Sequence, residues 1–549
     1  MRIRKSVRND SDHPRPINKP LATAVAAACG MSALLVMPQA FAQESLDEIT
    51  VTARKKPELL IDVPMNISSI SEAEIKSRNI VNKEDLYRTV AGAAGPGVHG
   101  SNNRGQLILR GLSGGNDATP DTTNVFTDGV PFNFDNVYDV ARVEVLRGPQ
   151  GTLYGSNAIG GTVRIVTNRP NLDELEVSGS LLVQQENNRP GTEVRGYGMV
   201  NIPIVEGSLG LRVTGSTGSK TGKILNIFDG HRGSTDEEFV RAQLMWEPSE
   251  KTRVNLSYVK QDYYSDEYQD VDLSTPPYYY EAILTPNDEA TYGYDVELTF
   301  PDCPLGSSRP ECKTMSIGSL VQTGYNPDFA TWYTLNHFEQ TDTDLVSLTI
   351  ERDDLLPGID LSYAGSFRNY EYNGRQNHWS RYDAQDMFRT WIDDFQGHDR
   401  WTHELRLQSS GDQAFEWTVG AFYDGVYGTP SENIQWQYHE ASNRGRAIAD
   451  YLWGYWWGYE DPTQLGIDLY NNPNVHYNGN QTRWDDTEFA IFGEASYTVD
   501  MGEAELELTA GIRYYDLKND YLYTDSGLWN NDTTEVKDGE DGTRLKFSA

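Results

Sequence analysis

Basic residues are scarce in this sequence. Its 549 residues include 46 Lys and Arg against 81 Asp and Glu, which gives a formal net charge of −35 at pH 7. Proteins bind nucleic acid through basic patches that release counterions, so this balance argues against a nucleic-acid partner. Long apolar runs are also scarce. The single one spans Leu21 to Met37, and no other stretch approaches the ~20 apolar residues of a membrane-spanning helix.

The N-terminal segment has the composition of an export signal. Six basic residues precede the apolar run, and Ala40-Phe41-Ala42 places small residues at the two positions that a signal peptidase reads. We therefore expect residues 1–42 to be a signal peptide and the mature chain to begin at Gln43. Lipidation at Cys29 is the less favoured alternative, because apolar residues continue well beyond it. Without residues 1–42 the formal charge is near −39.

Cysteine is nearly absent. Only Cys303 and Cys312 follow the expected signal peptide, and both lie in one polar segment. In an oxidising compartment such a pair is expected to form a loop-closing disulfide. No metal site is expected there, because zinc would need histidines or further cysteines nearby.

Catalytic patterns are missing too. Serines and histidines occur without a nucleophile elbow, no His-Glu-x-x-His pattern is present, and the acidic residues show no spacing that singles out an acid and base pair. The sequence is therefore interpreted as a protein that is not an enzyme. A surface glycosidase, suggested by acidic and aromatic loops, is the enzyme alternative, but it leaves residues 47–170 unexplained.

A repeat of two residues characterises the chain after residue 173. In the segment 415–424 apolar residues alternate with mostly polar ones, which places one set on each face of a β-sheet. The same alternation recurs at 240–246, 254–258, 346–350, 359–363 and 506–514. The mean hydropathy is only −0.59. A membrane barrel is compatible with this value, because only alternate residues face lipid.

The connections between these segments favour a transmembrane barrel over a soluble sandwich. Tight links are expected at 205–208, 248–251, 353–358, 410–413 and 500–503, and long polar excursions near 220–236, 263–338, 372–398, 428–483 and 518–540. Short and long links alternate, as in outer-membrane barrels with short periplasmic turns and long external loops. We expect about eleven strands and the start of a twelfth at Leu545–Phe547.

Residues 44–170 resemble the TonB-dependent receptor family. The segment Asp47-Glu48-Ile49-Thr50-Val51-Thr52-Ala53 is similar to the TonB box. The plug signature is matched by Leu-Ile-Leu-Arg-Gly at 107–111 and by the segments 125–131, 143–155 and 160–167. Two short segments of the expected barrel, 403–407 and 492–494, also match. Several motifs in the family's order are a stronger signal than any one of them.

This resemblance implies a domain organisation and a fold. A periplasmic extension with the TonB box would span 43–56 and a plug domain 57–170. The fold class is then a transmembrane antiparallel β-barrel at 173–549, with about 12 of an expected 22 strands present, and an N-terminal α/β plug domain. An open barrel would leave unpaired backbone groups in lipid, at several kcal/mol per group. The chain is therefore interpreted as C-terminally incomplete, with a genuine small barrel as the alternative.

The implied function is TonB-dependent active import of a scarce ligand across the outer membrane by a monomeric receptor. A ferric siderophore is the first candidate, with oligosaccharide, haem or cobalamin as alternatives. The expected partners are TonB of the inner-membrane energising complex, outer-membrane lipid and a small-molecule metal chelate. The ferric chelate would be transported ligand, and no cofactor is expected. A passive porin is disfavoured, because a plug would obstruct an open lumen.

Three groups of residues are the candidate functional sites. Residues 47–53 are expected to be extended, with free backbone groups that can add as a strand to a partner's sheet, although a frayed terminus is the alternative. The ligand-binding candidates lie on two loops of the plug: His99, Asn102, Asn103, Arg104, Asn116 and Asp117. A lone histidine such as His99 is more often a hydrogen-bonded loop residue than a metal ligand.

The third group consists of charged residues expected to join plug and barrel. Arg110 and Arg147 each end an apolar plug strand, and an unpaired guanidinium is costly in a dry interior. The alternation of the barrel strands points Glu404 and Glu494 into the lumen. We therefore predict ion pairs between these arginines and glutamates, with solvation in a wet lumen as the alternative.

Overall fold

The structure is a computed structural model of the chain. It describes residues 50–52, 55, 58–59, 63, 66–94, 107–112, 122–133, 136–155, 158–185, 191–222, 224–226, 231–267, 281–289, 293–299, 330–331, 337–377, 388–411, 413–439, 442–444, 447, 451, 474–501, 505–527 and 533–548. The expected signal peptide and the Cys303–Cys312 pair lie outside these residues.

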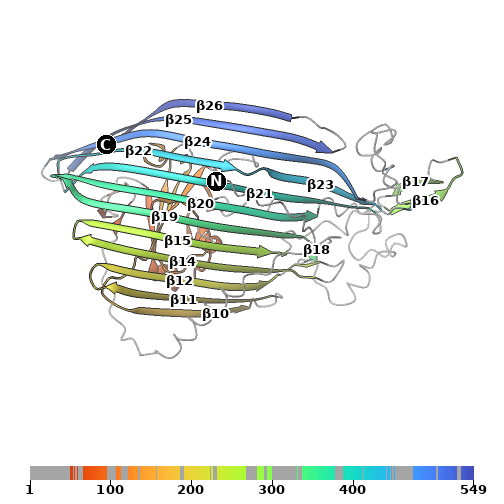
Figure 1. The fold of residues 1–549 in the computed structure, drawn as a ribbon, viewed down its shortest axis with the longest axis horizontal. Helices are drawn as coiled ribbons and strands as arrows, with labels where there is room; N and C mark the ends of the chain where they lie inside the picture. Colours follow the sequence, from red (N-terminus) through yellow and green to blue (C-terminus); the bar gives the residue numbers. More distant parts are fainter. Residues whose placement is uncertain are drawn as a thin grey trace, which may run out of the picture.

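A large antiparallel sheet dominates the molecule (Figure 1). Its strands pair in sequence order: β10 (Glu176–Gln185), β11 (Thr192–Val205), β12 (Leu209–Thr221), β14 (Ser234–Ser249), β15 (Thr252–Ser265), β19 (Phe338–Leu356), β20 (Ile359–Asn377), β21 (Phe388–Ser409), β22 (Phe415–Gly428), β24 (Asn474–Asp500), β25 (Glu505–Gly527) and β26 (Thr533–Ser548). β23 (Ser431–His439) lies in line with β22, because both strands pair with β21 on one side and with β24 on the other. The prediction of about twelve strands is confirmed.

Tight turns gather at one end of this sheet, at the left of Figure 1. Among the fully described links, they follow β11, β14 and β19, as the alternating link lengths predicted. At the opposite end a hairpin of β16 (Glu281–Pro286) and β17 (Tyr294–Thr299) projects beyond the sheet, and β13 (Leu225–Asn226) pairs with β18 (Ala330–Thr331).

The strands are longer than the hydrophobic pattern predicted. β24 has 27 residues, whereas about 9–11 residues suffice to cross a bilayer. The predicted loop 518–540 is mostly strand, since β25 runs to Gly527 and β26 begins at Thr533, twelve residues before the predicted start at Leu545. This boundary was wrong because strand residues beyond the lipid need no apolar face, and the alternation disappears there.

The two faces of the sheet have opposite chemistry. Leu256, Val346 and Ile512 are 43–51% exposed, and the residue beside each of them on the strand is a buried polar one. Asn255, Ser347 and Arg513 are those neighbours. The apolar residues therefore lie on the outer face and the polar residues face inward, as expected of a sheet whose outer face meets lipid.

The inner face contacts the plug domain. Its five-stranded sheet has the order β3 (Ile67–Ser71), β8 (Val140–Arg147), β9 (Gly161–Thr167), β6 (Thr123–Thr127) and β7 (Val130–Pro131), with β6 and β9 parallel. Short helices accompany it: α2 (Glu72–Ser77), α3 (Lys83–Thr89) and α4 (Gly151–Tyr154). β4 (Ala93–Ala94) pairs with β5 (Ile108–Leu109). Among the described residues, no helix has the length and apolar character to cross a bilayer.

The plug core extends into the large sheet. Val143, Val145 and Val163 of the plug are almost fully buried, and Phe239 and Val259 of the large sheet belong to the same apolar cluster. The plug is thus packed against the inner face around β14 and β15. Apart from such positions the contact is polar, because the inner face carries few apolar side chains.

Candidate functional site at the plug–barrel contact

The described part of residues 47–53, the predicted TonB box, is docked. Thr50–Val51 forms strand β1, which pairs antiparallel with β2 (Glu58–Leu59), and Val51 is fully buried. The backbone N–H of Thr52 donates to Glu144 Oε1 at 2.9 Å. The expectation of free backbone groups is therefore wrong for these residues. Asp47, Glu48, Ile49 and Ala53 lie outside the described part of the chain.

Glu144 is the anchor for this segment inside the plug. It lies in β8 with no exposed surface, and Arg142 Nε (2.8 Å) and Arg164 Nη1 (2.9 Å) bind its two oxygens. Arg164 also donates to the carbonyl oxygen of Thr52. Two guanidinium groups thus balance the charge of the desolvated carboxylate, and Oε1 accepts both from Arg142 and from the Thr52 backbone.

Lys55 connects this N-terminal segment to the large sheet through an ion pair. Its backbone N–H donates to Thr52 O (2.9 Å) in a turn that places Lys55 at a φ of 64°. Its Nζ lies 2.7 Å from Glu404 Oε1 and 2.6 Å from Oε2, and both side chains are at least 89% buried. Arg406 Nε lies 3.2 Å from Glu404 Oε1. Lys55, just after the predicted TonB box, is therefore ion-paired with strand β21.

The surroundings of the Lys55 ammonium are aromatic. The Nζ lies 4.9 Å from the ring centre of Tyr154 in the plug and 5.4 Å from that of Phe492 in β24. Burial lowers the pKa of Lys55 to about 7, with Arg406 adding to this effect and Glu404 opposing it. Burial also raises the pKa of Tyr154 to about 12, so its hydroxyl stays neutral. Lys55 is poised to lose its charge close to neutral pH.

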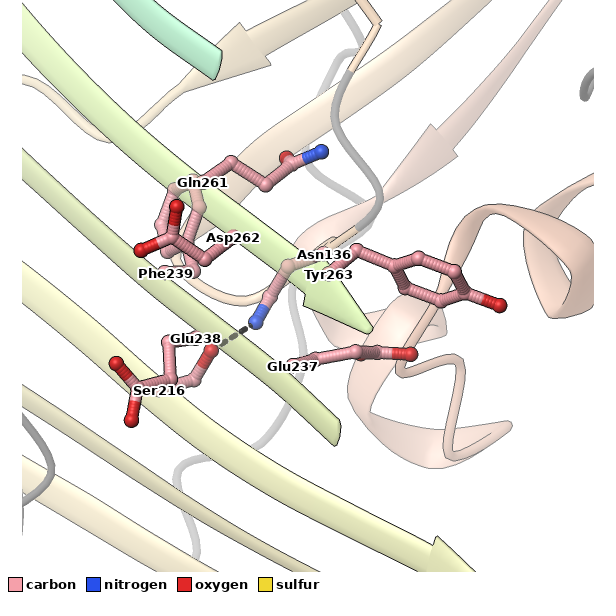
Figure 2. A pocket seen from close by; sticks show the side chains of 8 residues that line it. All are labelled: Asn136, Ser216, Glu237, Glu238, Phe239, Gln261, Asp262 and Tyr263. Carbon is pink, nitrogen blue, oxygen red and sulfur yellow. Dashed lines mark hydrogen bonds between the residues drawn. The ribbon is translucent and has the colours of Figure 1, made fainter. Parts of the chain in front are cut away.

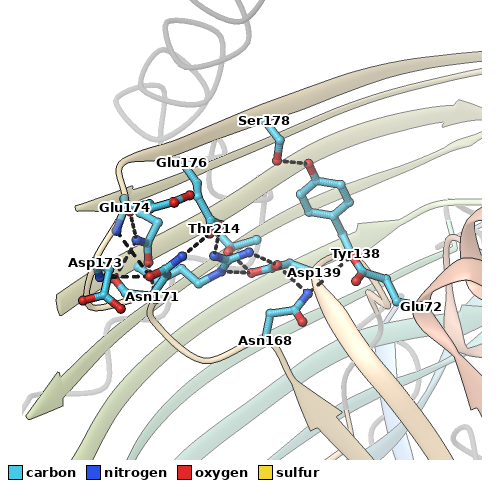
Figure 3. A network of polar contacts seen from close by, with 12 residues as sticks. Glu72, Tyr138, Asp139, Asn168, Asn171, Asp173, Glu174, Glu176, Ser178 and Thr214 are labelled. Carbon is cyan, nitrogen blue, oxygen red and sulfur yellow. Dashed lines mark hydrogen bonds and ion pairs between the residues drawn. The ribbon is translucent and has the colours of Figure 1, made fainter. Parts of the chain in front are cut away.

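A second ionic contact joins the plug to β12 and β14 (Figure 3). Asp139, in the turn before β8, accepts from Arg212 Nη2 (2.6 Å) and Nε (2.9 Å), from Arg241 Nη2 (3.0 Å) and from Thr214 Oγ1 (2.7 Å). Burial alone would raise the pKa of Asp139, but the hydrogen bond from Arg212 and the charge of Arg241 hold it below its usual value. Arg212 also binds Glu176 of β10 at 2.9 Å.

A small cavity lies between the plug and the same wall (Figure 2). Its lining residues are Asn136, Ser216, Glu237, Glu238, Phe239, Gln261, Asp262 and Tyr263. Asn136 of the plug donates to Ser216 of β12 there. This contact and the Asp139 cluster tie one edge of the plug to β12 and β14.

The predicted ion pairs are corrected by the structure. Glu404 and Glu494 do face inward and are buried, but their partners are Lys55 and, for Glu494, Lys546 at 2.8 Å. The guanidinium of Arg147 instead donates within the plug, to Ala91 O (3.1 Å), Asn66 Oδ1 (3.0 Å) and Ser68 Oγ (3.2 Å).

The pairing of β3 with β8 explains the intramolecular partners of Arg147, since it brings residues 66–68 beside the end of β8. Arg110 also has its contact within the plug: its backbone N–H donates to Gly92 O at 2.9 Å. Lys55 was overlooked, because a lysine between two basic neighbours has the signature of a solvated segment. The ligand candidates His99, Asn102, Asn103, Arg104, Asn116 and Asp117 lie outside the described residues.

The sequence and the fold are similar to those of known proteins. The TonB-dependent Receptor Plug Domain family matches residues 60–162. The iron-regulated outer membrane virulence protein of Vibrio cholerae is 30% identical over 201 residues, which are 34% of this chain and 30% of that protein. The pesticin receptor of Yersinia pestis is 34% identical over 138 residues, or 23% of this chain and 20% of that receptor. Residues 60–162 thus match the plug domain of TonB-dependent receptors, and the chain is similar to these receptors.

Solved receptor structures share its fold. The ferric yersiniabactin uptake receptor FyuA from Yersinia pestis superposes with a TM-score of 0.60 at 15% identity, covering 88% of this chain and 61% of that one. The unliganded ferric citrate transporter FecA gives 0.56 at 12% identity, covering 88% and 60%. The large sheet thus has the barrel architecture of these outer-membrane receptors. The chain spans less than two thirds of the length of these relatives.

Proposed function

We propose that this receptor imports a scarce ligand across the outer membrane at the expense of energy delivered by TonB, with residues 47–53 as the TonB box. The observation that carries the proposal is the docking of this segment. The box leads directly into Lys55, which contacts both the plug residue Tyr154 and the barrel residue Glu404. A force applied to the box would therefore be transmitted to the plug–barrel contact through only a few residues.

The bonds that hold the segment suit a device that must open. They are two ion-paired carboxylates, Glu144 and Glu404, and one short β-pairing. Water that enters as the segment is drawn out replaces each hydrogen bond, so separation needs no covalent step. Strand addition to a partner's sheet requires that Thr50–Val51 first leave β2. Ligand occupancy would favour the released state through a difference in ligand affinity between the two states.

A ferric siderophore is the ligand class that we favour. The Vibrio cholerae relative is named as iron-regulated, and a ferric enterobactin receptor of Pseudomonas aeruginosa is 30% identical over 190 residues. A vitamin B12 transporter of Vibrio vulnificus is 30% identical over 131 residues, so cobalamin is the second candidate. A passive porin is disfavoured, because the plug packs its apolar core against β14 and β15.

Uptake measurements test this proposal. The chain, expressed in a Gram-negative host that lacks its own iron-chelate and cobalamin receptors, is given radiolabelled ferric siderophores or cyanocobalamin. We expect accumulation of an iron chelate that stops when the proton-motive force is collapsed or TonB is deleted. Accumulation that persists without TonB would show a passive pore, and accumulation of cyanocobalamin alone would favour the second candidate.

A further inference from the structure

The outer face of β14, β15 and β19 changes from apolar to acidic along the strands. Three successive rows of residues that stand opposite one another across these strands are apolar or aromatic: Trp246, Val254 and Ile350; Leu244, Leu256 and Leu348; and Ala242, Tyr258 and Val346. Two rows farther along the same face, four carboxylates stand in register across four strands: Glu238 of β14, Asp262 of β15, Asp342 of β19 and Glu371 of β20. We call these four residues the acidic row.

The acidic row lies at the height of the lipid headgroups. Glu238 stands eight residues from Trp246 on β14, and a tilted strand needs about 9–11 residues to cross the bilayer. The row is on the side away from the tight turn between β14 and β15, which is the external side in barrels with short periplasmic turns. Tyr258 marks the boundary, as tyrosines do at membrane interfaces, and its hydroxyl donates to Asp344 Oδ1 at 2.6 Å.

One lysine contacts several carboxylates at this level. Lys260 Nζ lies 3.4 Å from Asp262 Oδ1 and 3.1 Å from Asp344 Oδ2, and it also binds Asp342. Like charges directly opposite on neighbouring strands repel each other. The acidic row therefore sets four carboxylates against one lysine, which Asp344 also shares.

The remaining cations near this face have acidic partners of their own. On β14, β15, β19 and β20, the other outward cation beyond the apolar rows is Arg375, and its Nε lies 2.6 Å from Asp393 Oδ1 of β21. His231, before β14, contacts Asp266 at 3.0 Å. Neither offsets the charge of the acidic row, so the row keeps an excess of negative charge.

Glu238 is the member of the row that most needs a cation. It is only 4% exposed, and its Oε2 has no hydrogen-bond partner among the described residues. Figure 2 shows its carboxylate on the same side of the strands as that of Asp262, whereas Glu237 and Tyr263 extend to the other side. A buried carboxylate oxygen without a partner is costly, and a bound cation would remove this cost.

We propose that the acidic row is a docking surface for the phosphate headgroups of the outer leaflet, which it binds through a divalent cation. Mg²⁺ and Ca²⁺ accept carboxylate and phosphate oxygens as ligands together. Among the described residues no group of three or more acidic, histidine or cysteine side chains could hold a metal ion alone, so the lipid phosphate completes the coordination. The proposal concerns the lipid side of the barrel and does not depend on the import function.

The sign of the charge sets the expected behaviour. Proteins usually attract anionic lipids with lysine and arginine, whereas carboxylates alone repel a phosphate. The acidic row should therefore bind phosphorylated lipid in the presence of divalent cations and repel it when they are removed. A basic surface would bind the same lipid under both conditions.

Lipid binding to the detergent-solubilised chain tests the docking surface. The probes are diphosphoryl lipid A and the same lipid without its phosphates, each titrated in Mg²⁺ and in EDTA. We expect tight binding of the phosphorylated lipid in Mg²⁺ alone. Equal binding of the two lipids in Mg²⁺, or equal binding of the phosphorylated lipid in Mg²⁺ and in EDTA, overturns the proposal.

Neutral variants separate the cation bridge from a folding defect. Glu238→Gln, and the double variant Asp262→Asn with Asp342→Asn, should weaken binding in Mg²⁺ by about fivefold for each carboxylate removed, the scale of one charge at a lipid surface. In EDTA the same variants should bind the phosphorylated lipid more tightly than wild type, because they repel it less. Losses under both conditions, or no change under either, would overturn the role of the row.

Asp354→Asn is the matched control. Asp354 is on β19 like Asp342, but it lies at the tight-turn end of the strand, where it pairs with Lys251. This variant should bind both lipids like wild type. A response equal to that of the double variant would show an effect of net charge alone and would overturn the assignment to the acidic row.

Discussion

Lys55 Nζ lies 2.6 Å from Glu404 Oε2, in an ion pair that joins residues 349 positions apart in the sequence. Lys55 lies two residues after the proposed TonB box, and Glu404 belongs to the barrel wall. Because both side chains are buried, the pair can only open if water reaches it or if the segment leaves. The contact is therefore suited to hold the TonB box until a force or a ligand-induced change releases it.

The first prediction concerns Glu404→Gln. Removing one partner of a buried ion pair can cost ~3 to 5 kcal/mol, although loss of the Lys55 proton would relieve part of this. We expect the segment to leave its docked position more often. A nitroxide label at Thr50→Cys, an exposed position, should then show a larger mobile fraction.

Asp354→Asn is the control for this experiment. It breaks the exposed Lys251–Asp354 pair (2.7 Å), whose attraction is screened by water and salt, so the variant should lose little stability. The label should respond to Glu404→Gln and not to Asp354→Asn. Equal mobility in both variants would contradict the role of Lys55 as a latch.

The second prediction is a pH dependence of docking. The pKa of Lys55 is about 7 when docked, whereas a released lysine titrates near ~10.4. A lowered pKa means that the docked state binds fewer protons, so docking becomes more favourable as pH rises from about 7 toward ~10.4 and is unaffected below this window. The immobile fraction of the Thr50→Cys label should rise from pH 7 to 9, by at most about tenfold in the docking equilibrium per pH unit.

A control must distinguish the titration of Lys55 from that of the other ionisable groups at this contact. Glu404, Arg406 and Arg513 act on the pKa of Lys55. The ring of Tyr154 also contacts its ammonium, but this tyrosine stays neutral through the same window. Lys55→Met keeps the bulk of the side chain and removes the titration. A label that responds to pH identically in this variant would assign the effect to another group.

The third prediction concerns the edge of the plug that Asp139 ties to β12 and β14. Asp139→Asn removes the carboxylate that the buried guanidinium groups of Arg212 and Arg241 share, and Arg212 keeps only its ion pair with Glu176. Removing one partner of a buried ion pair can cost ~3 to 5 kcal/mol. We expect the plug to detach from β12 and β14 at lower denaturant concentration, with increased entry of large antibiotics in cells. Asp354→Asn, which breaks the exposed Lys251–Asp354 pair between barrel residues, should have little effect. Similar leakage from both variants would contradict an anchoring role of Asp139.

The sequence predicted the parts of this fold that a membrane imposes. Alternation located Val346 and Ile512 on the outer face and Glu404 on the inner one, because lipid selects apolar residues at every second position. Strand ends such as Gly527 and Thr533 were missed, since water on both faces imposes no pattern. The partner of Glu404 was also missed. A period of two fixes the face of a residue, whereas its partner depends on where a segment 349 positions away is placed.

The last prediction tests the TonB box itself. Strand addition needs backbone N–H groups, so Ile49→Pro should abolish uptake while ligand binding at the cell surface stays at the wild-type level. Val51→Pro should have the same outcome for uptake but should also release the segment, because Val51 is buried and pairs with β2. Val51→Ala separates the two effects: it loses apolar contact and keeps the amide, so uptake should persist with a more mobile Thr50→Cys label. Wild-type uptake by Ile49→Pro would refute the assignment of residues 47–53, and loss of uptake in Val51→Ala would show that docking, and not strand addition, is the step that proline disrupts.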